Sequence, residues 1–223
     1  MAPKWRYIEE PLPDWVEGSM QERFTQIYKN RFWEASESAS GPGSTLEQTS
    51  KLIRELPLLL HSFEIKRLLD VPCGDFNWMH KVDLCEILVI GAEIVADLIK
   101  ENQQRFGSPN RQFLQLDMTV DPLPKVDLIL CRDGLVHLSF DDISKALANF
   151  RLSGSPYLLA TTFPSYGKNR DIKTGDWRPL NLEAPPFLLG EPTVLLNEDC
   201  PEEGFEDKSL GLWKLQDRNV PSR

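Results

Sequence analysis

Three acidic residues, Asp70, Glu93 and Asp117, each stand at the end of a short apolar run. An acid roughly 20 residues beyond the first strand of a βαβ unit, as Glu93 is, can accept hydrogen bonds from both hydroxyls of a ribose. Asp117 could accept a hydrogen bond from the exocyclic amine of adenine, with Leu116 and Met118 packed on the ring. Each acid alone could equally cap a helix or face solvent. Their recurrence after three successive runs favours one shared site.

The loop after Asp70 contains a single glycine, Gly74, and a second acid, Asp75. Glycine lets the backbone approach a ligand closely. A phosphate site needs glycine-rich amides facing an anion, whereas carboxylates repel pyrophosphate and suit an ammonium or sulfonium group. The loop therefore favours a ligand with a cationic amine over a dinucleotide, although a plain strand-to-helix turn would also fit it.

Asp133 and His137 follow a fourth apolar run at 126–131. If this segment is helical, their i, i+4 spacing places both on one face. Histidine has a pKa near neutrality and can take a proton from a hydroxyl acceptor. We therefore predict His137 as a base that Asp133 orients. The alternative is a structural histidine packed beside apolar neighbours.

The segment 161–181 follows a fifth apolar run and is expected to overhang the same site. It carries Asn169, Trp177, Arg178 and Asn181. An aromatic face can stack on a sugar ring, and amides can bind hydroxyls. We predict these four residues to bind a polyhydroxy acceptor; structural packing of the tryptophan is the alternative.

The elements that must position these residues follow from the periodicity. Strands are predicted at 67–71, 86–93, 111–117, 126–131, 156–163, 193–196 and 210–215. Helices are predicted at 21–33, from 44 or 45 to 60, at 95–105 and at 140–150, with a short helical turn at 77–79 and an irregular arm over 1–20. Apolar strands that alternate with helices predict a parallel sheet covered on both faces, with ligands at the carboxyl ends of its strands.

These residues resemble the class I S-adenosylmethionine-dependent methyltransferases. Leu68 to Asp75 stands in the place of their motif I, with Pro72 where the first glycine usually lies. A more specific resemblance is to a subgroup with three further patterns. They are Ser-x-Ser-Gly-x-Gly-Ser at 38–44, Pro-Cys-Gly-Asp-Phe-x-Trp-Met at 72–79 and Arg-Asp-x-Leu-Val-His at 132–137.

The resemblance implies an α/β, Rossmann-like methyltransferase fold with a mostly parallel sheet of about seven strands, helices on both faces and an N-terminal helical cap. We expect the arm and cap at 1–60 and an S-adenosylmethionine-binding catalytic domain at 61–223. The loop 38–44 would cover the methionine end of the cofactor, and its backbone amides would contact the carboxylate. The expected cofactor-binding residues are Trp33, Ser38, Gly41, Gly43, Ser44, Asp70, Pro72, Gly74, Asp75, Trp78, Glu93, Ile94, Asp117, Met118 and Arg132.

The expected reaction is O-methylation of a hydroxyl on a sugar, a glycan or another polar small molecule. An Asn/Asp-Pro-Pro-aromatic motif, which serves nitrogen acceptors, is absent after the fourth strand. Three alternatives stay open. They are a cofactor-binding module without catalysis, a methyltransferase for a protein or nucleic acid, and an NAD-dependent oxidoreductase, which the single glycine weakens.

The composition of the sequence limits the domain size, the class of partner and the cellular compartment that we expect. Hydrophobic residues form 41% of the 223 residues, enough for one α/β domain with an arm, and the formal net charge of −9 disfavours a nucleic-acid partner. The sequence shows neither a signal-peptide pattern nor the roughly 18 apolar residues of a membrane span. The four cysteines lack zinc-ligand spacing, so we assign no metal ligand. We expect Cys73, Cys85 and Cys131 to be buried free thiols of a soluble, cytoplasmic protein without membrane contact.

Overall fold

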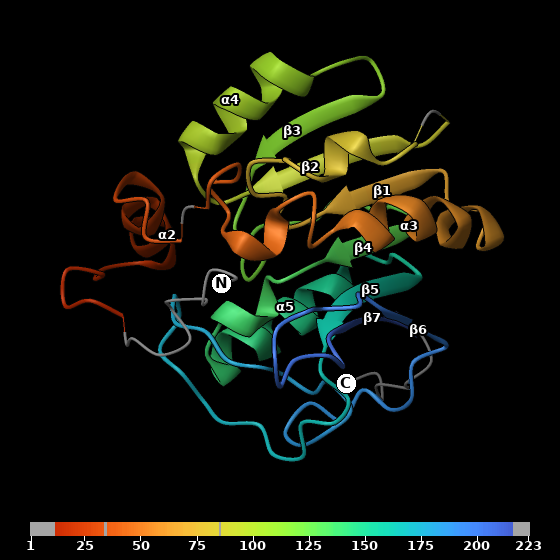
Figure 1. Cartoon of the computed structure of the whole chain (residues 1–223). Coiled ribbons are helices and arrows are strands. Elements are labelled where there is room, and N and C mark those ends of the chain that lie inside the picture. The colour runs from red at the N-terminus through yellow and green to blue at the C-terminus, as the bar shows by residue number, and fades with distance from the viewer. Residues whose placement is uncertain (1–11, 34, 85, 216–223) are drawn as a thin grey trace.

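The computed structural model describes residues 12–33, 35–84 and 86–215 (Figure 1). Seven strands form one sheet in the order β3-β2-β1-β4-β5-β7-β6. Their bounds are β1 Arg67–Asp70, β2 Leu88–Glu93, β3 Arg111–Gln115, β4 Leu128–Cys131, β5 Tyr157–Thr162, β6 Val194–Asn197 and β7 Ser209–Lys214. The first five are parallel, and β7 runs antiparallel to both β5 and β6. All seven predicted strands are therefore present, and the sheet is mostly parallel as expected.

Alternation along the central strands builds two hydrophobic layers. Neighbouring residues of a strand point to opposite faces, so Leu68 and Leu69 enter different cores. On one face, α3 (Ser50–Ser62) packs Leu56 and Leu60 against the sheet, and α4 (Ala96–Phe106) lies on the same side. On the other face, α5 (Phe140–Leu152) packs Phe150 into the second core. Helices thus cover both faces.

The N-terminal part differs from its prediction in two places. The first helix, α2, spans Met20–Lys29 rather than 21–33, begins with a capping box between Ser19 and Glu22, and stands at the left margin of Figure 1. The helix predicted to start at residue 44 or 45 is α3 and begins at Ser50. Before it, Pro42–Ser44 forms a 3₁₀ turn, and the Glu37 carboxylate accepts the amide of Leu46, which holds the chain in a loop. Because α3 packs on the sheet, it is not part of a separate cap.

Short 3₁₀ turns follow two strands. The turn predicted at 77–79 is observed at Met79–Lys81, and a second one at Leu135–His137 follows β4.

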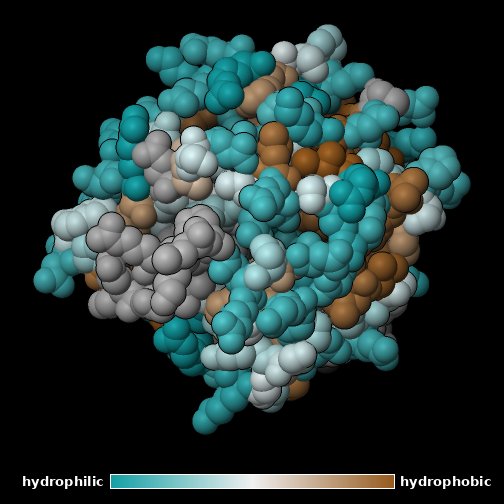
Figure 2. Space-filling view, viewed as in Figure 1, coloured by the Kyte–Doolittle hydropathy of each residue, from teal (hydrophilic) through white to brown (hydrophobic). Residues whose placement is uncertain are grey.

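Cys73, Cys131 and Cys200 are free and buried, as predicted for the first two, while Cys85 and residues 1–11 lie outside the described residues. In the described part of the chain, no helix has the length and apolar character to cross a membrane. Figure 2 shows a mostly hydrophilic face whose hydrophobic atoms gather toward its right-hand half.

Candidate functional site

A pocket lies where the chain changes direction across the sheet. From β1 it proceeds to β2 and β3 on one side, and then it returns to β4 and β5 on the other. In open α/β sheets, ligands bind outside the carboxyl ends of the strands at this switch point. The pocket here holds about 1080 Å³ of empty space, open mouth included, and is lined from the ends of β1, β2, β3 and β4.

Asp70 ends β1 and points a carboxylate into this pocket. The residue is 3% exposed, and no hydrogen bond from any described residue reaches its carboxylate. Burial raises the pKa of Asp70 to about 8, with Arg132 opposing the rise and Glu93 adding to it. A mostly buried carboxyl is unstable in its charged form unless a hydrogen bond or an opposite charge compensates it, and Arg132 compensates Asp70 only in part. The position is therefore suited to a ligand that brings a cation.

Glu93 ends β2, and the backbone holds its carboxylate from two sides. Its oxygens accept the amides of Ile94 at 2.8 Å and Gly74 at 3.2 Å, and more distantly that of Val95. Burial raises the pKa of Glu93, and these three amides oppose the rise. Gly74 itself has a φ of +52°, and a Cβ there would collide with the hydroxyl of Ser40. The loop after β1 is thus bonded to Glu93 through the Gly74 amide, and at Gly74 it packs closely against Ser40 of the loop at 38–44.

Asp117 follows β3 and is held by a short turn. Its Oδ1 accepts both the amide and the hydroxyl of Thr119, at 2.8 Å and 2.6 Å. It lines the pocket beside the apolar side chains of Ile94, Leu116 and Met118. A carboxylate at the edge of an apolar slot can bind the amine of a flat heteroaromatic ring.

Asp75 lines the pocket, and its carboxylate also holds the loop at 38–44. Its Oδ2 accepts the amide of Ala39 at 2.7 Å, and its Oδ1 accepts the hydroxyls of Ser38 and Ser40 and the amide of Asn77. The second acid of the loop therefore holds the loop at 38–44 in place. The amides of Ala39 and Ser40 are occupied within the protein, so they are not available to an anion.

A group of four charged residues lies at the pocket, and two of them, Arg132 and Asp133, line it. Arg132 donates to both carboxylate oxygens of Glu198, at 2.7 Å and 3.2 Å, and to the carbonyl of Gly43. Lys208 lies 2.6 Å from the carboxylate of Asp133. Burial would raise the pKa of Asp133, but Lys208 and Arg132 outweigh it and lower the pKa to about 2. Sequence reasoning missed Glu198, just after β6, and Lys208, just before β7, which pair with Arg132 and Asp133 behind the pocket lining.

His137 lines the pocket without the predicted help from Asp133. Its Nδ1 lies 2.9 Å from the carbonyl of Asp176, which can only accept, so Nδ1 carries the proton and Nε2 has a free lone pair. Trp33 stacks on the imidazole with centroids 4.2 Å apart. Burial lowers the pKa of His137 to about 4 against the opposing effects of Asp176 and Asp133. The imidazole is therefore neutral at physiological pH.

The predicted i, i+4 face of Asp133 and His137 is wrong. Asp133 has a φ of +51°, which breaks the helical path, and the residues after it form a single 3₁₀ turn. Asp133 bonds to Thr161 and Lys208 instead of to the imidazole. Both side chains nonetheless line the same pocket.

The four residues predicted to bind the acceptor lie outside the pocket, and this prediction is corrected. Asn169 and Asn181 tie their loop together through backbone groups, including the amide of Asn169 to the carbonyl of Asn181 at 2.8 Å. Trp177 is buried against Phe163 and Phe205. Arg178 is fully buried on backbone carbonyls. Their polar atoms and rings therefore stabilise the segment.

The pocket brings together most of the residues predicted for the cofactor: Trp33, Ser44, Asp70, Pro72, Gly74, Asp75, Trp78, Glu93, Ile94, Asp117, Met118 and Arg132. Ser38, Gly41 and Gly43 do not line it. Sequence reasoning missed the inner face of α2, which contributes Met20, Phe24, Ile27 and Tyr28. Their helical spacing marked an apolar face, but nothing in the sequence shows what that face covers.

No protein-family model and no curated protein matches the sequence. Solved structures do. Magnesium protoporphyrin IX methyltransferase from Synechocystis PCC 6803, with bound SAM, matches with a TM-score of 0.59 and 12% identity over 89% of this chain and 97% of that one. An S-adenosylmethionine-dependent methyltransferase from Clostridium acetobutylicum ATCC 824 matches with a TM-score of 0.56 and 14% identity over 74% and 91%.

A third match, protein PH0226 from Pyrococcus horikoshii OT3, has a TM-score of 0.45 and 19% identity over 52% of this chain and 58% of that one. The two longer matches show that the chain has the Rossmann-like fold of S-adenosylmethionine-dependent methyltransferases.

Proposed function

We propose that this protein is a methyltransferase that binds S-adenosylmethionine in the pocket at the ends of β1 to β4. The observation that carries the proposal is Asp70, a carboxylate that lines the pocket, is 3% exposed and has no hydrogen-bond partner among the described residues. The ammonium group of the methionine part would supply that partner. The fold shared with S-adenosylmethionine-dependent methyltransferases supports the same ligand.

The remaining residues fit the other parts of this cofactor. Glu93 accepts three backbone amides and keeps about one of its four lone-pair sites, on Oε2, for a ribose hydroxyl. Asp117 and its apolar neighbours suit the adenine. When bound, S-adenosylmethionine supplies a methyl group on a positively charged sulfur. We further propose that α2 caps the pocket, since Met20, Phe24 and Ile27 line it.

Isothermal titration of the purified protein with S-adenosylhomocysteine tests the binding. We expect saturable heat for the unaltered protein and at least a tenfold loss of affinity for Asp70→Ala and for Glu93→Ala, because a buried charge-assisted hydrogen bond is worth about 1.5–3 kcal/mol. Asp141→Ala, which removes an exposed acid of α5, is the control and should bind normally. No heat with the unaltered protein, or equal affinity for all variants, would contradict the proposal.

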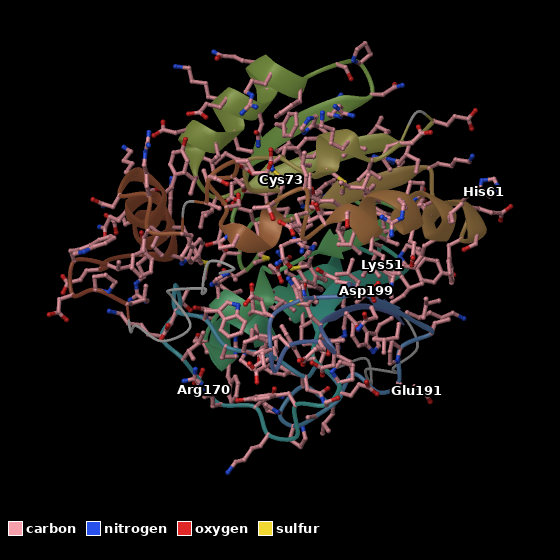
Figure 3. The ribbon with its side chains drawn as sticks, in the orientation of Figure 1. Lys51, His61, Cys73, Arg170, Glu191 and Asp199 are labelled. Atoms are coloured by element: carbon pink, nitrogen blue, oxygen red, sulfur yellow. The ribbon has the colours of Figure 1, made fainter. Side chains whose placement is uncertain are left out.

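For the reaction, we propose transfer to a hydroxyl whose proton passes to Nε2 of His137. The imidazole is neutral, its Nδ1 is fixed on the Asp176 carbonyl, and it lines the pocket beside Asp133. Asp133 stays ionised beside Lys208 and can stabilise the protonated imidazole. We propose a hydroxyl of a sugar, a glycan or another polar small molecule as the acceptor, on the ground that His137 can take its proton; the four residues of segment 161–181 do not support this choice, because they lie outside the pocket. We place the reaction in the cytoplasm, in keeping with the free thiols of Cys73 (Figure 3), Cys131 and Cys200.

His137→Ala tests the base. We expect kcat to fall by about 10² to 10⁴-fold with unchanged affinity for the cofactor, since general base catalysis supplies that factor. Because the active imidazole is neutral and its pKa is lowered to about 4, the rate of the unaltered enzyme should be flat from pH 6 to pH 8 and fall only below about pH 5. Turnover by His137→Ala at the original rate would exclude this role.

A further inference from the structure

Residues 174–178, part of the long loop after β5, form several hydrogen bonds with the turn that contains His137. The amide of Gly175 donates to the carbonyl of His137 at 2.8 Å, and the imidazole Nδ1 donates to the carbonyl of Asp176 at 2.9 Å. The amide of Arg178 donates to the carbonyl of Val136 at 3.2 Å. Both the backbone and the ring of His137 are thus held by the same few residues.

The guanidinium of Arg178 also donates hydrogen bonds to the backbone of this turn. It is fully buried, and its Nη1 donates to the carbonyls of Leu135 and Val136 at 2.9 Å and 2.6 Å. Its Nη2 donates to the carbonyl of Leu138 at 2.7 Å. Only its Nε lacks a hydrogen-bond partner in the described part of the chain. Burying this charge is costly, because no carboxylate bonds to it directly and the more distant charges of Asp171 and Asp176 offset its desolvation only in part.

The turn needs such support. A single 3₁₀ turn has poor hydrogen-bond geometry, and the carbonyls at a helix end lack partners within the helix. A planar guanidinium presents several donors at fixed angles and can reach three carbonyls at once, whereas the ammonium of lysine is a compact point charge on a flexible chain. The geometry of the turn therefore accounts for an arginine at this position.

We propose that Arg178 is a positioning residue: it fixes the turn at 135–138 so that His137 presents Nε2 to the pocket with Nδ1 held on Asp176. This inference rests on the proposed function only where it concerns methyl transfer. The placement of the imidazole can be measured without any activity.

The measurement is nitrogen NMR of the histidine side chains in the complete protein. The chain has three histidines, His61, His80 and His137, so their signals can be assigned by substitution. In the unaltered protein we expect His137 to hold its proton on Nδ1 and to titrate well below the usual range. The charged groups that act on its imidazole are Asp133, Arg178 and Lys208.

Arg178→Lys is the informative variant because it keeps the positive charge and removes the planar guanidinium with its donors at fixed angles. We expect the Nδ1 tautomer to lose its dominance and the pKa of His137 to move up toward 6.5 as the turn loosens. In the methyl-transfer assay, kcat should fall by about 100-fold, as expected for a displaced catalytic group, with unchanged KM and cofactor affinity. Arg54→Lys, which alters an exposed arginine that also bonds to a backbone carbonyl, is the control. It should leave the tautomer and pKa of His137 and the value of kcat unchanged.

Gly175→Ala provides an independent variant in case Arg178→Lys does not fold. Gly175 has a φ of +105°, so an alanine strains the residue whose amide holds His137 while every buried charge stays in place. As in Arg178→Lys, we expect the Nδ1 tautomer of His137 to become less dominant and the pKa of His137 to rise. Loss of thermal stability with an unchanged His137 tautomer, pKa and kcat in the variant that folds would overturn the proposal. A shifted imidazole in a protein without methyltransferase activity would preserve it and count against the proposed function instead.

Discussion

Asp70 is the residue on which the proposed chemistry depends most, and its surroundings destabilise the protein without a ligand. It sits at the end of a central strand, buried and without a hydrogen-bond partner among the described residues. Burial raises its pKa to about 8, from an ordinary value of 3.8. A group whose pKa is raised by folding contributes stability below its unfolded pKa, and this contribution is lost as the pH rises through the folded pKa.

Asp70→Asn should therefore stabilise the ligand-free protein in a pH-dependent way. The unaltered protein loses stability from this group between about pH 4 and pH 8, by at most about 1.4 kcal/mol per pH unit, while asparagine does not titrate. The gap in unfolding free energy between the variant and the unaltered protein should widen from pH 5 to pH 8 and then level off. Urea denaturation at these pH values measures it, and a constant gap would show that Asp70 is ionised throughout.

The acids at the strand ends could be predicted from the sequence because an apolar run and the acid that ends it are adjacent in the chain. Asp75 could not be assigned in this way, since its partners Ser38 and Ser40 lie more than thirty residues earlier. Arg178 was predicted to bind substrate from its type alone. Only the fold shows that its donors are consumed by the turn at 135–138.

At the scale of elements, the β6–β7 hairpin is tied to the end of β4 by buried charges. Glu198, just after β6, bonds to Arg132, just after β4, and Lys208, just before β7, bonds to Asp133. Two cations and two anions are enclosed together. Removing one partner of such a group leaves a buried charge without compensation.

Glu198→Ala should lower the free energy of unfolding by about 3–5 kcal/mol, because Arg132 loses its main partner. Asp199→Ala is the matched control: its exposed carboxylate pairs with the partly buried Lys51 on α3 (Figure 3), and a solvent-screened pair contributes at most about 1 kcal/mol. Denaturant unfolding of both variants measures the difference. Equal losses would show that the buried group does not stabilise the hairpin.

The order of the elements was easier to predict than their ends. The central strands β1, β4 and β5 are almost continuous apolar runs, whereas β3 and β6 are only partly buried; all seven were located, and the alternation of strands with helices indicated a parallel sheet. The start of α3 at Ser50 was missed because the Glu37 side chain, outside the helix, holds the preceding loop. The role of α2 was incompletely predicted, since an amphipathic face does not reveal its partner.

For the whole molecule, fold and charge constrain the function together. The fold is that of S-adenosylmethionine-dependent methyltransferases, and the sequence carries a formal net charge of −9. A net negative charge on average weakens association with nucleic-acid phosphates, and the acids that line the pocket suit the cationic ligand proposed here.

The most direct test of the account is proton release on cofactor binding, measured by titration calorimetry at pH 6 in buffers of different ionisation enthalpy. At that pH the cofactor amine is protonated, and Asp70, with its pKa raised to about 8, is also protonated in the free protein. Forming the ion pair must then expel about one proton per S-adenosylhomocysteine bound. We predict a buffer-dependent binding enthalpy that corresponds to this release. Binding without proton release, or no binding at all, would contradict the account.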